Sequence, residues 1–236
     1  MEVTFKIKRS DAQSDGKAKE QSYVLDVDPD NSVFDALVRI REEQDGSLAF
    51  RGACRSGFCG DCTLACGRDE IVSCMVPVSK VAKDGEVPLE PLKNTKVIKD
   101  LLTDWNRFLW NKYTSIRPWL SSNGAPTEAV TEEALEAVRL AMRCTMCGMC
   151  DDGCTVIDID KDFLGPAALT KLYRLVKDPR DVETERRFRE AGERGGLGGQ
   201  IPDLDRGTSA GDSDTSGPSP RHAGVNPVDP QDGHSL

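Results

Sequence analysis

The stretch from Arg51 to Cys74, RGACRSGFCGDCTLACGRDEIVSC, decides the fold of the first half of the chain. Three of its cysteines follow the pattern C-x4-C-x2-C and a fourth comes further on; they are Cys54, Cys59, Cys62 and Cys74. This is the plant-type spacing that holds a [2Fe-2S] cluster. A loop that curls around an inorganic core needs positive φ values and close approach of the backbone, which we expect Gly52, Gly57 and Gly60 to supply.

A structural zinc site and a disulfide framework are the alternatives for these cysteines. Zinc sites usually pair two C-x2-C knuckles, whereas the first pair here is C-x4-C. Disulfides suit small secreted chains, and the N-terminal sequence MEVTFKIKRSD has no apolar signal-peptide region. Cys66 lies between the third and fourth predicted ligands, and we expect it to be a small buried apolar residue.

Length, charge and hydropathy narrow the class of protein. The 236 residues suffice for two small domains, and 9 cysteines are more than a cytosolic chain needs for packing. The net charge of -9 argues against a nucleic-acid partner. No apolar run approaches the roughly 20 residues that cross a bilayer, so we expect any contact with a membrane to go through another subunit.

Hydrophobic periodicity predicts an N-terminal sheet with one helix. Residues 3–7 and 23–27 alternate apolar and polar side chains, as the two strands of a hairpin do. Ser32 is expected to cap a helix that ends at Gln44 to Gly46. Further strands are predicted over residues 47–50, 71–76 and 86–89.

From Val97 onward the apolar residues follow a helical period. The first predicted helix has one face made of Val97, Ile98, Leu101, Leu102, Trp105, Phe108 and Leu109. A second runs from about Thr131 to Arg143, and its inward-facing residues are expected to be Leu135, Val138, Ala141 and Met142. A third opens at Gly165 and closes at Asp178. Apolar periodicity is lost from about Asp181, and residues 188–236 are predicted to be disordered.

A second cysteine motif lies between the last two predicted helices. Cys144, Cys147, Cys150 and Cys154 form C-x2-C-x2-C-x3-C, the bacterial run in which three thiolates hold one [4Fe-4S] cluster and the fourth ligates a different cluster. The same four thiolates would also satisfy one tetrahedral zinc ion. No cysteine follows Cys154, and both histidines lie in the predicted tail, which argues against Rieske-type ligation.

Six stretches, in the same order along the chain, make the sequence similar to one family. They are SVFDALVRI, LAFRGACRSGFCGDC, PLEPLKNTKVIKDLLTDW, SIRPWL, CTMCGMCDDGC and DKDFLGPAALTKLYRLVKDPRD. The chain resembles the iron-sulfur subunit of succinate dehydrogenase and fumarate reductase from residue 1 to about residue 187. The resemblance implies an α+β fold with three parts: a β-grasp, plant-type 2Fe-2S ferredoxin domain (1–95), an incomplete all-α bacterial-ferredoxin-like domain (96–187) and a disordered tail (188–236).

The resemblance also implies which residues bind cofactors. Cys54, Cys59, Cys62 and Cys74 match the [2Fe-2S] ligands, Cys144, Cys147 and Cys150 match three [4Fe-4S] ligands, and Cys154 matches a [3Fe-4S] ligand or the fourth ligand. In the family, single electrons pass along the clusters from a FAD-containing flavoprotein subunit to quinone at membrane-anchor subunits. The chain would then be a subunit without the catalytic centre, cytoplasmic and peripheral on the inner face of the cell membrane.

The chain departs from the family pattern after Cys154. The family's second cysteine run is absent, Thr155 stands in place of the usual proline, and the aromatic pair of the quinone pocket is replaced around Asp158 and Ile159. A truncated or frame-shifted copy, thiols donated by a separate subunit, or a one-cluster [2Fe-2S] carrier would each account for these departures. A zinc-binding assembly protein and a subunit of a soluble fumarate reductase with thiol donors stay open as alternatives.

Overall fold

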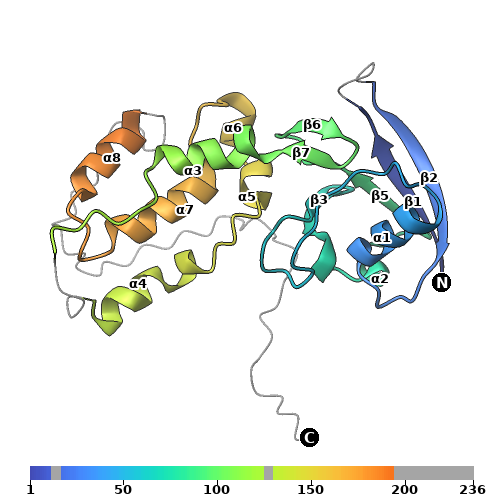
Figure 1. The fold of residues 1–236 in the computed structure, drawn as a ribbon, viewed down its shortest axis with the longest axis horizontal. Helices are drawn as coiled ribbons and strands as arrows, with labels where there is room; N and C mark the ends of the chain where they lie inside the picture. Colours follow the sequence, from blue (N-terminus) through green and yellow to red (C-terminus); the bar gives the residue numbers. More distant parts are fainter. Residues whose placement is uncertain (12–16, 125–129, 194–236) are drawn as a thin grey trace, which may run out of the picture. The chain divides into compact units, whose positions relative to one another are not determined.

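The first part of the chain forms a five-stranded mixed sheet crossed by one helix (Figure 1). The computed structural model describes residues 1–11, 17–124 and 130–193, all within the unit Met1–Ile201. The strands are β1 (Glu2–Arg9), β2 (Lys19–Asp26), β3 (Thr63–Cys66), β4 (Asp69–Val72) and β5 (Glu86–Glu90). Their order is β2-β1-β5-β3-β4; β1 and β5 are parallel, and the other neighbouring strands are antiparallel.

The predicted hairpin and the predicted first helix are both confirmed. Strands β1 and β2 pair with Phe5 opposite Tyr23. Helix α1 (Val33–Glu43) begins after Ser32, whose hydroxyl accepts a hydrogen bond from the Asp35 amide at 3.1 Å. That bond satisfies one of the amides that a helix leaves free at its start. The sheet and the helix share one apolar core, whose most buried members include Val3, Phe5, Ile7, Leu37, Ile40 and Leu89.

Two predicted strands differ from the structure. Residues 47–50 form no strand: Ser47 ends a turn, residues 48–50 are irregular, and the amides of Ser47 and Leu48 bond back to Asp45 at 2.9 and 3.1 Å. The strand predicted over 71–76 ends at Val72, where a 3-10 turn, η1 (Ser73–Met75), takes over. A short helix, α2 (Val78–Val81), leads from that turn to β5.

The helix predicted from Val97 is wrong over its first eight residues. A two-stranded hairpin, β6 (Lys96–Lys99) and β7 (Leu102–Asp104), occupies this stretch. The buried carboxylate of Asp100, at the turn with φ 51°, accepts hydrogen bonds from the Ser10 and Ala49 amides at 3.2 and 3.0 Å. It also pairs with Arg9 at 2.8 Å. These contacts with the sheet outweigh the local helical pattern, and helix starts only at the π-helical turn η2 (Asn106–Trp110).

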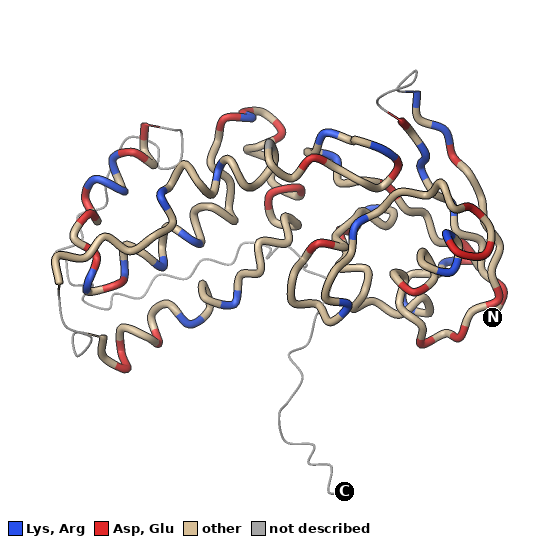
Figure 2. Tube along the Cα trace, viewed as in Figure 1, with Lys and Arg blue, Asp and Glu red and all other residues tan. Residues whose placement is uncertain are grey.

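The second part of the described chain is helical (Figure 1). After η2 come α3 (Asn111–Ser115), α4 (Glu132–Met142), α5 (Met149–Asp152), α6 (Thr155–Ile159), α7 (Gly165–Val176) and α8 (Thr184–Glu193). The predicted helices near 131–143 and 165–178 are therefore confirmed. Thr131 caps α4 by accepting a bond from the Ala134 amide at 3.2 Å. Figure 2 shows acidic and basic residues interspersed along both the sheet and the helices.

Helices α4 and α8 depart from the expectation in opposite ways. On α4 the predicted inward residues Val138 and Ala141 are buried, but Leu135 and Met142 are 43% and 55% exposed. Helix α8 was not predicted, and its last six residues, 188–193, fall in the stretch assigned to the disordered tail. Arg187 anchors α8 by donating hydrogen bonds to the carbonyls of the chain that precedes α4, which a search for apolar periodicity does not detect. The rest of the predicted tail, 194–236, lies outside the described residues.

Candidate functional site

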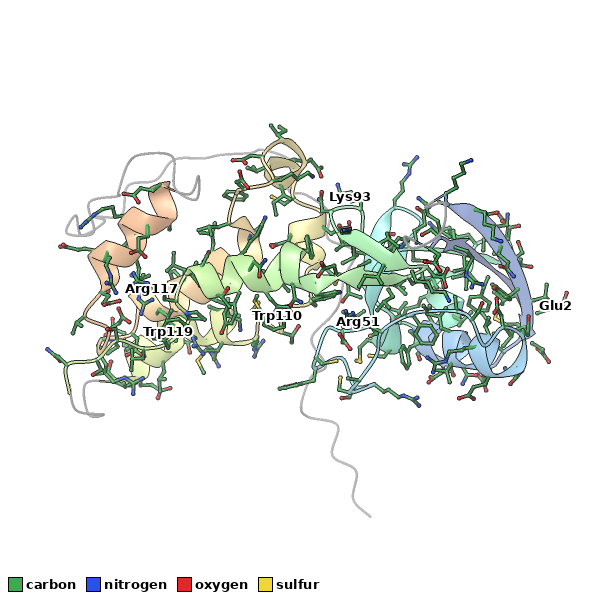
Figure 3. All side chains as sticks on the ribbon, turned by 45° about the horizontal axis from the view of Figure 1, so that its top comes forward. Glu2, Arg51, Lys93, Trp110, Arg117 and Trp119 are labelled. Atoms are coloured by element: carbon green, nitrogen blue, oxygen red, sulfur yellow. The ribbon has the colours of Figure 1, made fainter. Side chains whose placement is uncertain are left out.

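The first cysteine motif lies in the loop between α1 and β3 and in the turn after β4. Cys54 is exposed, Cys59 is half-buried, and Cys62 is buried at the start of β3. Cys74 lies in η1, and its neighbour Ser73 donates bonds from its amide and its hydroxyl to the Cys62 carbonyl at 3.3 and 2.8 Å. The sheet thus brings the distant fourth cysteine back to the loop. Figure 3 shows Arg51 beside this loop, where sulfur atoms gather.

Backbone amides point at the sulfur atoms of this loop. Four hydrogen bonds are present: Ser56 and Cys59 donate to Cys54 at 3.4 and 3.3 Å, Asp61 donates to Cys59 at 3.4 Å, and Gly57 donates to Cys74 at 3.3 Å. The amides of Ser56 and Cys59 lower the pKa of the Cys54 thiol to about 6. The thiolate is the form that binds metal, and hydrogen bonds to sulfur tune an iron-sulfur cluster. Burial outweighs the Gly57 amide at Cys74 and raises the pKa of that thiol to about 11, so the loop favours the thiolate at Cys54 and not at Cys74.

Glycine is required at the three glycine positions of the loop for different structural reasons. Gly57 and Gly60 have φ values of 71° and 69°, as predicted. Gly52 does not have a positive φ, so that part of the prediction is wrong. A Cβ at Gly52 would lie 2.1 Å from the Phe34 ring, so the need there is close packing. Arg55, with φ 55°, takes the remaining left-handed position in spite of its side chain.

Cys66 is set apart from the four loop cysteines. It lies on β3 opposite Asp69 and is buried in the sheet core. Burial raises the pKa of its thiol to about 11, which keeps it neutral and unreactive. These features agree with the expectation of a small apolar residue.

The second motif follows α4. Cys144 comes just after that helix, Cys147 precedes α5, Cys150 lies within α5, and Cys154 is the residue before α6. Although Cys150 as a residue is exposed, desolvation of its thiol raises its pKa to about 12, and the charges of Asp151, Cys147 and Cys144 add to the shift.

The described residues contain no group of three or more His, Cys, Asp or Glu side chains placed to hold a single metal ion. An iron-sulfur cluster spreads its thiolates over several irons, one or two on each, so neither predicted cluster needs such a group.

Two buried carboxylates between Cys150 and Cys154 were missed by the sequence reasoning. Asp151 accepts a hydrogen bond from the Ala167 amide, in the first turn of α7, at 2.8 Å. Asp152 accepts one from the Asn94 amide at 2.7 Å. Burial raises the pKa of both carboxyl groups. The only signal in the sequence is the pair of acidic residues inside a cysteine motif.

Asn94 makes the connection to the segment after Cys154. Its side chain donates to the Asp152 carbonyl and to the Asp158 carboxylate, both at 2.9 Å, and accepts from Lys161 at 2.7 Å. Lys93 pairs with Asp158 at 3.0 Å and is labelled in Figure 3. Polar contacts therefore fix the stretch in which the sequence departs from the family pattern.

The two cysteine loops touch each other. A Cβ added to Gly60 would lie 2.5 Å from the Cα atom of Cys147. Gly60 lies between Cys59 and Cys62, and Cys147 is the middle thiol of the neighbouring group. The structure therefore places the two candidate cluster sites in backbone contact.

Comparison with known proteins agrees with this geometry. The family described as "2Fe-2S iron-sulfur cluster binding domain" matches residues 4–110. The chain is 33% identical over 193 residues to "Succinate dehydrogenase [ubiquinone] iron-sulfur subunit 1, mitochondrial" of Oryza sativa subsp. japonica, covering 78% of this chain and 68% of the relative. The chain belongs to the family of succinate dehydrogenase iron-sulfur subunits. It is thus an electron-transfer component of an oxidoreductase complex, and family membership favours this role over the zinc-binding and thiol-dependent alternatives.

A solved structure has the same fold as this chain. A chain of "Mycobacterium smegmatis Sdh1 complex in the apo form" superimposes with a TM-score of 0.73 at 22% identity, over 85% of this chain and 84% of that chain. The mixed α+β fold with a 2Fe-2S ferredoxin domain follows from these matches. Within residues 1–11, 17–124 and 130–193, no helix combines the length and the apolar character needed to cross a membrane.

Proposed function

We propose that Cys54, Cys59, Cys62 and Cys74 bind a [2Fe-2S] cluster in a β-grasp ferredoxin domain that covers residues 1–95. The observation that carries this proposal is the set of four amide hydrogen bonds to Cys54, Cys59 and Cys74. Such donors stabilise the thiolate of Cys54, whose pKa they lower, and they would favour the reduced, more negative cluster once it is bound. The mixed sheet with a crossing helix supports the β-grasp assignment.

Cys144, Cys147 and Cys150 would bind a [4Fe-4S] cluster in a helical domain that covers residues 96–187. The bacterial-type spacing of these cysteines supports this assignment. Cys154, which precedes α6, would serve as the fourth ligand or as a ligand of a [3Fe-4S] cluster. Asp151 and Asp152 would hold the peptide between these ligands in place through α7 and Asn94.

The clusters supply one-electron chemistry, and the chain supplies their positions and surroundings. By analogy with its relatives, the chain would receive electrons from a FAD-containing flavoprotein subunit and pass them toward quinone at membrane-anchor subunits. It would lie peripherally on the cytoplasmic face of the membrane through those partners. No side chain of the chain would make or break a bond of the substrate.

Iron analysis and EPR spectroscopy of protein purified without oxygen test the proposal. About six iron atoms per chain are expected for one [2Fe-2S] and one [4Fe-4S] cluster, and about two would leave a one-cluster carrier. The dithionite-reduced chain should show a rhombic [2Fe-2S] signal that is lost in Cys59→Ser. Cys66→Ser is the matched control and should keep the signal. Zinc in place of iron, or a signal that survives Cys59→Ser, would overturn the assignment.

A further inference from the structure

Gly60 is held rigidly between two of the proposed [2Fe-2S] ligands. Its residue is buried, and its carbonyl accepts bonds from the Thr63 amide at 3.2 Å and the Thr63 hydroxyl at 2.7 Å. Thr63 is the first residue of β3, so Gly60 is fixed to the sheet. A residue that cannot shift presents a fixed surface to whatever packs against it.

The surface that packs against Gly60 is the backbone of Cys147. An added Cβ would lie 2.5 Å from the Cys147 Cα atom, 2.6 Å from its Cβ atom and 3.1 Å from its amide nitrogen. Backbone atoms cannot swing aside as the end of a flexible side chain can. Any side chain at position 60 would therefore push the second cysteine loop away.

Two other glycines show that the contact, and not the φ value alone, sets Gly60 apart. Gly67 has φ 65°, yet the nearest atom to its added Cβ is Pro88 Cγ at 3.8 Å. Gly85 has φ 76° with nothing within 4 Å. Both need glycine for backbone conformation only. Gly60 needs it for conformation and for the approach of Cys147.

Contacts near Cys154, the last cysteine of the second motif, also hold the second loop against the first part of the chain. The Asn94 amide bonds to Asp152, and an added Cβ at Gly153 would lie 3.8 Å from the Glu70 carboxylate on β4. The second loop is thus close to β4 near its last cysteine as well as to Gly60 near its second. The second loop therefore lies close to Gly60 because several contacts hold it there, and not because of one residue.

We propose that the contact between Gly60 and Cys147 is the crossing point for electrons between the two cysteine loops, with Gly60 as the positioning residue. This inference rests on the proposed function, since it requires both loops to hold clusters. One electron leaves the reduced first centre, which is oxidised, and enters the second centre, which is reduced; no bond or proton changes. A reduced flavin would supply the electron in the complex, and dithionite supplies it in the experiment. Electron tunnelling weakens steeply with distance, so a loop pushed outward at position 60 slows this step.

Gly60→Ala tests the proposal, with Gly67→Ala as the matched control for strain at a positive φ. Each full chain is purified without oxygen and reduced stepwise with dithionite, and the spin relaxation of the [2Fe-2S] signal is measured by EPR power saturation. In the wild-type chain, relaxation should accelerate when the second centre becomes paramagnetic. We expect Gly67→Ala to keep this acceleration and Gly60→Ala to lose it while keeping the [2Fe-2S] signal itself.

The outcomes separate failure of this inference from failure of the proposed function. Unchanged acceleration in Gly60→Ala would overturn the inference alone. A wild-type chain with about two irons would overturn the proposed second cluster as well as the crossing point. If Gly60→Ala loses its first cluster while Gly67→Ala keeps it, Gly60 is needed to form the first site and not to set the distance between the sites, which overturns the inference.

Discussion

Arg187 and Asp181 form an ion pair of 2.8 Å in which the two side chains are only 1% and 0% exposed. Arg187 also donates to the carbonyls of Ile116, Arg117 and Trp119 at 3.1, 2.8 and 2.8 Å. In Figure 3, Arg117 and Trp119 are labelled in the stretch before α4. One guanidinium on α8 thus satisfies the polar groups of a segment about seventy residues earlier.

Arg187→Ala should destabilise the helical part strongly. Removing one partner of a buried pair leaves the other charge uncompensated, and this costs about 3–5 kcal/mol. The matched control is Arg186→Ala, since the Arg186 side chain is 43% exposed and pairs with Glu183, three residues earlier in the chain. Urea unfolding followed by circular dichroism measures both variants. Equal, small changes in the two variants would contradict a structural role for the buried pair.

Asp45 should make the unfolding free energy depend on pH below neutrality. Hydrogen bonds from Ser47, Tyr23 and Arg9 hold the pKa of this carboxyl well below its usual range. A carboxyl whose folded pKa is depressed adds stability above its unfolded pKa of about 3.9, and this stability is lost as pH falls below that value. Asp45→Asn should therefore be less stable than wild type at about pH 7, and the gap should shrink toward about pH 3. A gap that stays constant across urea titrations in this range would count against the assignment.

Gly165→Ala should disturb the second cysteine motif. Gly165 has φ 84°, and an added Cβ would lie 2.6 Å from the Asp151 carboxylate, which bonds the first turn of α7. The left-handed conformation alone costs a non-glycine residue about 1–3 kcal/mol. Gly153→Ala is the control, since its nearest neighbour is 3.5 Å away and its φ is -76°. Iron content and thermal unfolding should fall in Gly165→Ala and stay near wild type in Gly153→Ala.

Cys66→Ala should keep the [2Fe-2S] absorption spectrum, whereas Cys62→Ala should lose it. Both cysteines are buried at either end of the β3 region, so the two variants remove similar packing. Cys66 packs in the sheet core, and its replacement should cost about 1 kcal/mol of stability. Visible absorption and chemical unfolding of the two proteins, side by side, check both statements. Loss of colour in Cys66→Ala would place this thiol in the cluster.

Local sequence patterns predict the elements whose stability comes from nearby residues. Alternation predicts β1 and β2, and the Ser32 hydroxyl that caps α1 lies three residues from its partner. The pattern misleads at Val97, because Asp100 is held by Ser10 and Ala49, which are far away in the chain.

The candidate site divides in the same way. Spacing alone predicts the two cysteine loops as candidate ligand sets, and the amides that point at sulfur follow from the glycine-rich turn. The sequence does not predict the contacts that support these loops. Asn94 bonds to Asp152, and Gly60 packs against Cys147, in both cases across more than fifty residues of chain. Asp151 is a buried carboxylate whose partner, the Ala167 amide, lies in another helix. No local period or motif encodes such long-range contacts.

The β6–β7 hairpin lies in the chain between the two cysteine loops and is bonded to both parts of the molecule. Asp100 fastens the hairpin turn to the sheet, and Asn94, just before the hairpin, is bonded to Asp152 and Asp158. The connecting peptide is therefore held by hydrogen bonds at Asn94 and at Asp100. If both loops hold clusters, as proposed, these bonds would oppose changes in the gap between them, and electron transfer would not have to wait for a hinge to close.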